Sequence, residues 1–70
     1  MMEIFAERLR ELRTEQNLSY RRLGIILSVS EALIRQWEKS ICEPNFTMLL
    51  RIADHFNTDP NYLLGVDDAP

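Results

Sequence analysis

Apolar residues recur in the first part of the chain at the spacing of an amphipathic helix. Phe5, Leu9 and Leu12 stand at positions i, i+4 and i+7, which places them on one side of a helix with 3.6 residues per turn. Charged residues fill most of the positions between them. The pattern therefore predicts a first helix over about residues 3–15, and Asn17 can adopt the left-handed backbone that closes a helix.

Two shorter amphipathic segments follow, and only residues 28–30 separate them. Residues 20–27 predict a helix capped by Ser19, whose hydroxyl can accept a hydrogen bond from the first turn. Residues 31–39 predict the next helix, capped in the same way by Ser30. Two helices this short cannot bury themselves alone. Joined this tightly, they are typical of a helix-turn-helix, whose second helix is shaped to lie in a DNA major groove.

The interior of this motif can also be predicted from the sequence. Gly24 stands in the middle of the first of the two helices, where glycine costs up to about 1 kcal/mol relative to alanine. A close approach of another backbone, expected where the two helices cross, would account for it. Val29 is expected to fill the gap between the helices. The buried side of the second helix is expected to be Leu33 or Ile34 together with Trp37.

Two more helices are predicted in the C-terminal half. Asn45 can cap a helix whose inward positions are expected to be apolar, namely Phe46, Leu49, Leu50, Ala53 and Phe56. Asp59 and Pro60 begin a last short helix, in which proline at the first position loses no hydrogen bond, and Gly65 ends it. Residues 66–70 read as a short acidic tail. Five helices with no strand pattern predict an all-α fold.

Charge is distributed unevenly along the chain. The 70 residues carry a net charge of -3 and have a pI of about 5.0, which counts mildly against a nucleic-acid binder. Residues 20–40, however, carry four basic and two acidic side chains, whereas the segments on either side are net acidic. The only positive third of the chain is the predicted helix-turn-helix. Positive charge is what contact with DNA phosphates requires.

Several classes of protein are disfavoured by the composition. Cys42 is the only cysteine, and no cysteine or histidine cluster indicates a metal site, so a reducing cytoplasmic location fits. The chain has no basic leader and no run of about 20 apolar residues, so neither a signal peptide nor a membrane span is expected. With two glycines and no nucleophile–base set, neither an enzyme nor a bound cofactor is expected.

An ordered set of residues at fixed spacing runs through this pattern. It consists of Phe5, Arg8-Leu9, Leu12-Arg13, Asn17-Leu18-Ser19, Leu23, Leu27, Val29-Ser30, Ile34, Trp37-Glu38, Glu43-Pro44, Leu49-Leu50, Ala53 and Asp59 to Gly65. With this set the chain resembles the phage repressor/Cro family of helix-turn-helix proteins, the xenobiotic-response-element class. The resemblance covers about residues 5–65, with the motif at about 20–39. It implies a five-helix, repressor-like domain that binds operator DNA sequence-specifically, often as a dimer.

The resemblance implies that the exposed N-terminal part of the second motif helix faces base edges. The residues there are Glu31, Ala32 and Leu33, and Gln36 follows one turn along the same face. A glutamine can make a bidentate contact to adenine. A glutamate can accept from cytosine N4 or simply repel DNA, and alanine and leucine can touch only apolar groups such as the thymine methyl.

It also implies contacts with the DNA backbone and one structural ion pair. The expected phosphate-contacting residues surround the motif, and they are Tyr20, Arg21, Ser30, Arg35, Lys39 and Asn45. Arg21 and its neighbour Arg22 could equally form a plain solvated face. Arg13 and Glu38 would form a partly buried ion pair that ties the motif to the first helix. Removing one partner would strand the other, at about 3–5 kcal/mol if burial is deep.

A second interpretation stays open because of two isoleucines. Ile25 and Ile26 cannot both turn inward when Leu23 already does. An exposed isoleucine, joined by Leu33, could mark a dimer or partner surface, or it could be a scattered apolar residue of no consequence. We therefore interpret the chain first as a homodimeric DNA-binding transcriptional regulator, a repressor. The alternative is a protein-interaction module on the same fold, such as an antitoxin, a corepressor or a regulator subunit, with weak or no DNA binding.

Overall fold

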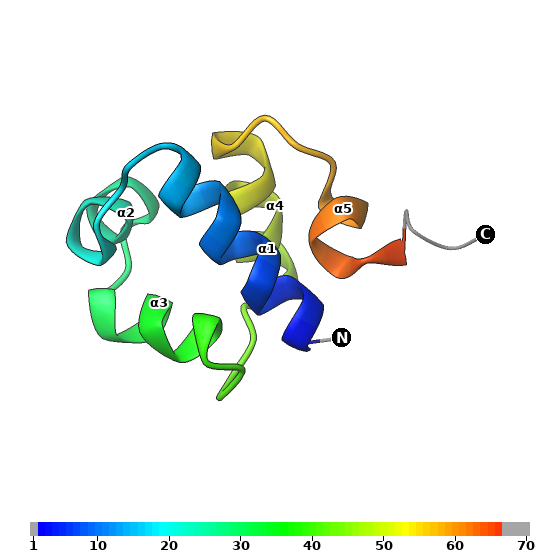
Figure 1. The fold of residues 1–70 in the computed structure, drawn as a ribbon, viewed down its shortest axis with the longest axis horizontal. Coiled ribbons are helices and arrows are strands. Elements are labelled where there is room, and N and C mark those ends of the chain that lie inside the picture. The colour runs from blue at the N-terminus through cyan, green and yellow to red at the C-terminus, as the bar shows by residue number, and fades with distance from the viewer. Residues whose placement is uncertain (1, 67–70) are drawn as a thin grey trace.

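The computed structural model describes residues 2–66, and within them the chain forms five α-helices and no strand (Figure 1). The helices are α1 (Met2–Glu15), α2 (Tyr20–Leu27), α3 (Glu31–Glu38), α4 (Phe46–His55) and α5 (Pro60–Leu64). The predicted all-α, five-helix fold is therefore confirmed. Apart from Val66, the predicted acidic tail lies outside the described residues.

The helices begin at the capping residues that the sequence predicts. Ser19, Ser30 and Asn45 each accept a hydrogen bond from the backbone N–H three residues further on, at 3.0, 3.1 and 2.8 Å. Asp59 accepts from the N–H two residues on, at 2.8 Å, and so begins α5. A cap of this kind typically stabilises a helix by about 1 kcal/mol. Local side-chain chemistry thus sets where four of the five helices start.

Residues with a left-handed backbone end several helices. Asn17 (φ 56°) follows α1 and Gly65 (φ 81°) follows α5, as the sequence predicts. Ser28 also adopts this region, with φ 60° and ψ 41°, at the end of α2. A residue with a Cβ is strained there by roughly 1–2 kcal/mol. The turn between α2 and α3 is therefore held in a conformation that serine does not favour.

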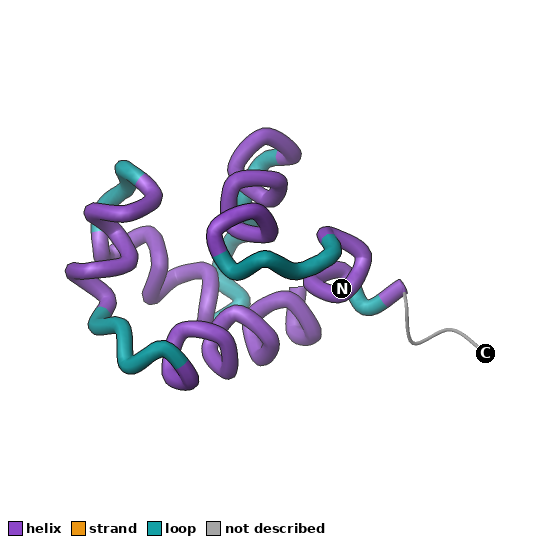
Figure 2. Tube along the Cα trace, turned by 90° about the horizontal axis from the view of Figure 1, so that it is seen from above, coloured by secondary structure: helices purple, strands orange, loops and turns teal. Residues whose placement is uncertain are grey.

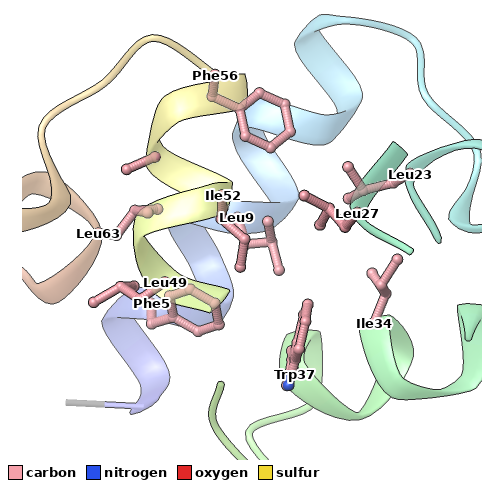
Figure 3. Packing of buried hydrophobic residues seen from close by; sticks show 11 residues of the cluster. Phe5, Leu9, Leu23, Leu27, Ile34, Trp37, Leu49, Ile52, Phe56 and Leu63 are labelled. Atoms are coloured by element: carbon pink, nitrogen blue, oxygen red, sulfur yellow. The ribbon is translucent and has the colours of Figure 1, made fainter. Parts of the chain in front are cut away.

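One apolar cluster joins all five helices (Figure 3). Its buried members are Phe5, Leu9, Leu23, Leu27, Ile34, Trp37, Leu49, Ile52, Ala53, Phe56 and Leu63. Ile34 and Trp37 point from α3 toward the middle of the cluster, and the Trp37 ring meets the Phe5 ring edge-on with centroids 6.4 Å apart. Each helix is too short to be stable alone, so this shared burial is what stabilises it.

The buried face of α4 differs from the prediction. Phe46 and Leu50 were expected to face inward, but Phe46 is 71% exposed and Leu50 is also exposed, whereas Ile52 is fully buried. The observed stripe of Leu49, Ile52, Ala53 and Phe56 follows the spacing i, i+3, i+4 and i+7. Leu50 lies one residue off this stripe, and Phe46 is the first residue of the helix, beyond the end of the cluster.

The helices are arranged around α1, which contacts both α3 and α5. Figures 1 and 2 place the N-terminal end of α1 beside α5, and α2 at the opposite end of the molecule. α2 packs against α3 to form the helix-turn-helix. Of the helices within residues 2–66, none is long and apolar enough to span a lipid bilayer.

The crossing of α2 and α3 explains Gly24. A Cβ built on Gly24 would lie 2.7 Å from the carbonyl oxygen of Val29, and 3.4 Å from the backbone nitrogen of Glu31. Both neighbours are backbone atoms, and the Val29 N–H is itself bonded to the Gly24 carbonyl at 2.9 Å. A Cβ at position 24 could therefore be accommodated only if the backbone of the turn between α2 and α3 moved.

The substitution Gly24→Ala is accordingly expected to destabilise the protein, although alanine favours a helix. We expect a loss of about 1–3 kcal/mol in the free energy of unfolding, the usual range for overpacking. Urea unfolding followed by circular dichroism measures this loss. A rise in stability of about 1 kcal/mol, the value expected from helix propensity alone, would show that the two backbones are not in close contact.

Candidate nucleic-acid interface

α3 divides into a buried side and an uncovered side. Ile34, Trp37 and Glu38 are buried, whereas Ala32 and Gln36 are exposed. The buried side packs onto α1 and α2. The motif thus presents one face of an eight-residue helix outward, and α3 lies along the lower edge of the fold in the view of Figure 1.

The predicted base-reading residues do not share one environment. Ala32 and Gln36 are exposed and Glu31 is half-buried, so all three are accessible. Leu33 is half-buried as well, but it packs against the apolar cluster. The Gln36 amide oxygen accepts a hydrogen bond from the Cys42 thiol, with sulfur and oxygen 3.6 Å apart. Ala32, Gln36 and Glu31 therefore form the accessible part of the face, and Leu33 belongs more to its support.

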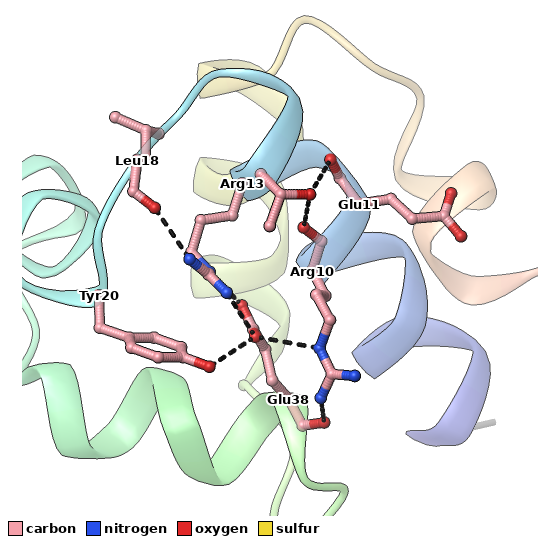
Figure 4. A network of polar contacts seen from close by, with 7 residues as sticks. Arg10, Glu11, Arg13, Leu18, Tyr20 and Glu38 are labelled. Atoms are coloured by element: carbon pink, nitrogen blue, oxygen red, sulfur yellow. Dashed lines mark hydrogen bonds and ion pairs between the residues drawn. The ribbon is translucent and has the colours of Figure 1, made fainter.

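Glu38 is the buried charge of the motif, with 1% of its side chain exposed (Figure 4). The Arg13 Nε atom lies 2.7 Å from one carboxylate oxygen, and the Arg13 Nη2 atom lies 3.1 Å from the other. Arg13 also donates to the Leu18 carbonyl at 2.9 Å. The ion pair that the family resemblance implies is thus present, in a bidentate form. The hydrogen bond to Glu38 raises the pKa of Arg13 above its ordinary value, against the opposing effect of burial.

Two further residues bind Glu38, and neither was predicted to. The Tyr20 hydroxyl donates to the carboxylate at 3.2 Å. Arg10 approaches the same oxygen at 3.5 Å and donates to the Glu38 backbone carbonyl at 3.2 Å. The only feature of the sequence that could have indicated this contact is the position of Arg10, one helical turn before Arg13 on α1. The network joins α1, the start of α2 and the end of α3.

Tyr20, which is predicted to contact phosphate, makes its contacts within the protein in this structure. Its hydroxyl proton is used inside the protein, on Glu38, and its ring is half-buried. The Arg13 guanidinium carbon lies 4.1 Å from the centroid of that ring, and the Arg35 guanidinium carbon lies 5.0 Å from it. The family resemblance implies a contact with the DNA backbone for this residue. The phenol is long enough to reach the buried carboxylate instead.

The residues predicted to contact phosphate are accessible but differently engaged. Arg21 and Lys39 are exposed. Arg35 forms an ion pair with Glu31, with Nη2 and Oε1 3.3 Å apart. The side-chain oxygens of Ser30 and Asn45 accept from the backbone at the starts of α3 and α4. At these two positions a phosphate would therefore meet the backbone N–H groups of a helix N-terminus rather than a free side chain.

The two isoleucines of α2 both remain outside the core. Ile25 is 62% exposed and Ile26 is also exposed. Ile25 lies beside Arg21 and Arg22 in a shallow hollow of about 240 Å³. Within residues 2–66, no group of three histidine, cysteine or acidic side chains is placed to hold a metal ion.

The sequence of the chain is similar to a known helix-turn-helix family and to a phage repressor. The model of a family described as a helix-turn-helix domain matches residues 4–68. Repressor protein C2 of Salmonella phage P22 is 35% identical over 65 residues, which is 93% of this chain. The chain spans about 30% of the length of that curated relative.

Solved structures show the same arrangement. The P22 c2 repressor in complex with synthetic operator 9T in the presence of Tl+ superposes with a TM-score of 0.80 at 36% identity, covering 84% of this chain and 89% of the other. The solution structure of the P22 c2 DNA-binding domain (1–76) gives 0.79 at 37% identity, covering 86% and 79%. The restriction-modification controller protein C.AhdI from Aeromonas hydrophila gives 0.79 at 26% identity, covering 89% and 94%.

The Glu38 network makes a prediction about stability. Glu38→Gln would leave the guanidinium of Arg13, whose side chain is 12% exposed, without its counter-charge. We expect the free energy of unfolding to fall by about 3–5 kcal/mol, as for other broken buried pairs. Chemical denaturation at neutral pH measures the loss.

Arg10→Ala is the matched comparison, since Arg10 binds the same carboxylate but is 56% exposed. It is expected to cost at most about 1 kcal/mol, because solvent screens an exposed pair. Equal losses in the two variants would contradict the view that Arg13 and Glu38 form the essential pair.

Proposed function

Because the chain belongs to the helix-turn-helix domain family, we propose that it is a sequence-specific DNA-binding transcriptional regulator, and specifically a repressor. The observation that carries this proposal is the position of α3. Its inner side is fixed by the core and by Glu38, and its outer side is uncovered. The relative whose structure contains operator DNA has the same fold at 36% identity, which supports the same use of the helix here.

Contacts with the DNA backbone would supply most of the affinity. Arg21 and Lys39 are exposed cations within the only positive third of the chain. The N-termini of α2 and α3 add backbone N–H groups, and helix N-termini attract phosphate. Phosphate contacts of this kind position the protein and make binding salt-dependent, but they do not distinguish sequences.

Discrimination between sequences would come from Glu31, Ala32 and Gln36. Gln36 can offer its amide to adenine N6 and N7, and Ala32 can touch the thymine methyl. A single helix of eight residues contacts few base pairs. We therefore propose that two copies bind as a homodimer to half-sites about one DNA turn apart, roughly 34 Å.

The proposal is tested by measuring binding to duplex fragments from upstream of the encoding gene. Fluorescence anisotropy at several salt concentrations should show an affinity that falls steeply as salt rises. No salt-sensitive binding even at low salt would contradict the proposal.

Two variants separate the expected kinds of contact. Lys39→Ala should weaken binding to all duplexes alike and lower the salt slope by about 1, whereas Gln36→Ala should relax the preference at one base pair by about 1–3 kcal/mol. Competition between duplexes that differ at single positions measures both effects. A change in preference caused by Lys39→Ala would show that the two roles are assigned wrongly.

The exposure of Ile25 favours one alternative function. An uncovered isoleucine in a positively charged hollow could bind an acidic protein partner, as an antitoxin or corepressor would. We expect Ile25→Ser, which removes the apolar side chain without adding a charge beside Arg21, to weaken a stable complex strongly if this is the function, and to leave specific DNA binding intact if it is not. Co-purification and anisotropy on the same variant distinguish the two outcomes.

A further inference from the structure

The outer face of α3 carries an acidic residue where a DNA-binding helix meets its ligand. Glu31 is the first residue of α3 and its side chain is 43% exposed. A carboxylate there opposes the approach of phosphates. It also has a favourable position relative to the helix dipole, so its presence could be purely structural. The contacts around it decide between these possibilities.

Glu31 is held by a chain of contacts that begins in the scaffold. Arg35, one turn further along α3, lies 3.3 Å from the Glu31 carboxylate. The Arg35 guanidinium also lies over the ring of Tyr20, 5.0 Å from its centroid. Tyr20 is fixed in turn by its hydrogen bond to the buried Glu38. Arg35 therefore lies between Tyr20 of α2 and Glu31 of α3, and it contacts both.

This arrangement changes what the carboxylate does in a groove. Arg35 supplies an opposite charge next to Glu31, which reduces the repulsion from phosphates. The carboxylate still has free acceptor lone pairs, because a carboxylate offers about four acceptor sites. An ionised carboxylate has no proton to donate. The pair is thus nearly neutral as a whole, while the carboxylate itself presents only acceptors at the tip of α3.

An acceptor-only group selects among base edges by rejecting other acceptors. Guanine presents two acceptors in the major groove, and thymine presents one beside its methyl group. Adenine offers an amino group next to the acceptor N7, whereas cytosine offers its N4 amino group without a neighbouring acceptor on the same base. Cytosine is therefore the base that suits Glu31 best.

We propose that Glu31 is a specificity-determining residue that selects cytosine at one position of each half-site, and that Arg35 is the residue that positions it. This inference rests on the proposed function as a DNA-binding regulator. Tyr20 couples the pair to the scaffold, so the selection depends on α2 as well as α3.

The test uses the 70-residue chain and a pool of duplexes with a randomised 20-base-pair segment, selected by binding and then sequenced. Glu31→Gln keeps the shape but gives a group that can donate as well as accept, which suits adenine. At one position per half-site, the preference should move from cytosine toward adenine, with a loss of discrimination of roughly tenfold. Glu7→Gln removes the same charge from an exposed site on α1, outside the motif, and should leave every base preference unchanged.

Arg35→Lys tests the positioning role. Lysine keeps the positive charge but lacks the flat guanidinium that lies over the Tyr20 ring and can grip a carboxylate. Because the charge is kept, any change in overall affinity should be the same for all duplexes, while the cytosine preference should weaken at one position per half-site. Tyr20 is left unchanged in this test because its hydroxyl also bonds Glu38.

The outcomes distinguish the inference from the function beneath it. If the unsubstituted chain selects sequences but Glu31→Gln keeps every preference, Glu31 is only a helix-end residue and the inference is overturned while the proposed function stands. If the unsubstituted chain shows no salt-sensitive binding to the pool, both fail. A shift at one position per half-site, absent in Glu7→Gln, supports the inference.

Discussion

The burial of one carboxylate, that of Glu38, is the constraint on which the motif depends. An ionised group with 1% exposure is stable only if charged or polar partners replace water around it. Those partners are Arg13 and Arg10 from α1 and Tyr20 from the start of α2, all at 2.7–3.5 Å. Apolar burial is non-directional, so the packing of Ile34 and Trp37 restrains the orientation of α3 less strictly than hydrogen bonds do. The directional contacts of Glu38 fix how α3 is held, and hence which of its residues face outward.

The sequence predicted well those features that depend on near neighbours in the chain. Caps such as Ser30 act over three residues, and the glycine at position 24 signals a close approach whatever the partner is. The prediction for the inward face of α4 was partly wrong: helical spacing from Leu49 includes Ile52 and excludes Leu50, whereas the exposure of Phe46 depends on where the core ends. The Arg13–Glu38 pair came from the family resemblance, since the two residues are 25 positions apart and nothing local joins them. The hydrogen bond from Tyr20 to Glu38 could not be predicted from the sequence, because nothing local shows that a buried acceptor lies within reach of the phenol.

The chain also shows how an acidic protein can carry exposed positive charge on one motif. Its negative charge is concentrated outside residues 20–40, and within that segment both acidic residues are paired with arginines. Glu38 is neutralised in the interior and Glu31 at the surface. Exposed cations such as Arg21 and Lys39 therefore remain on the surface of this segment, and both of its acidic side chains already have arginine partners. Net charge is consequently a weak guide to the partner of this protein, and the local pairing of charges is a better one.

Tyr20 connects the two halves of this arrangement. Its hydroxyl bonds the buried Glu38, while its ring contacts Arg13 on the inside and Arg35 at the surface. The anchor of α3 and its outer ion pair are thus parts of one network, and residues in one network do not contribute additively to stability. A change at Tyr20 would loosen the anchor and release Arg35 at the same time. In the proposed function, the precision with which α3 reads DNA is tied to the stability of the scaffold, because the same aromatic side chain serves both.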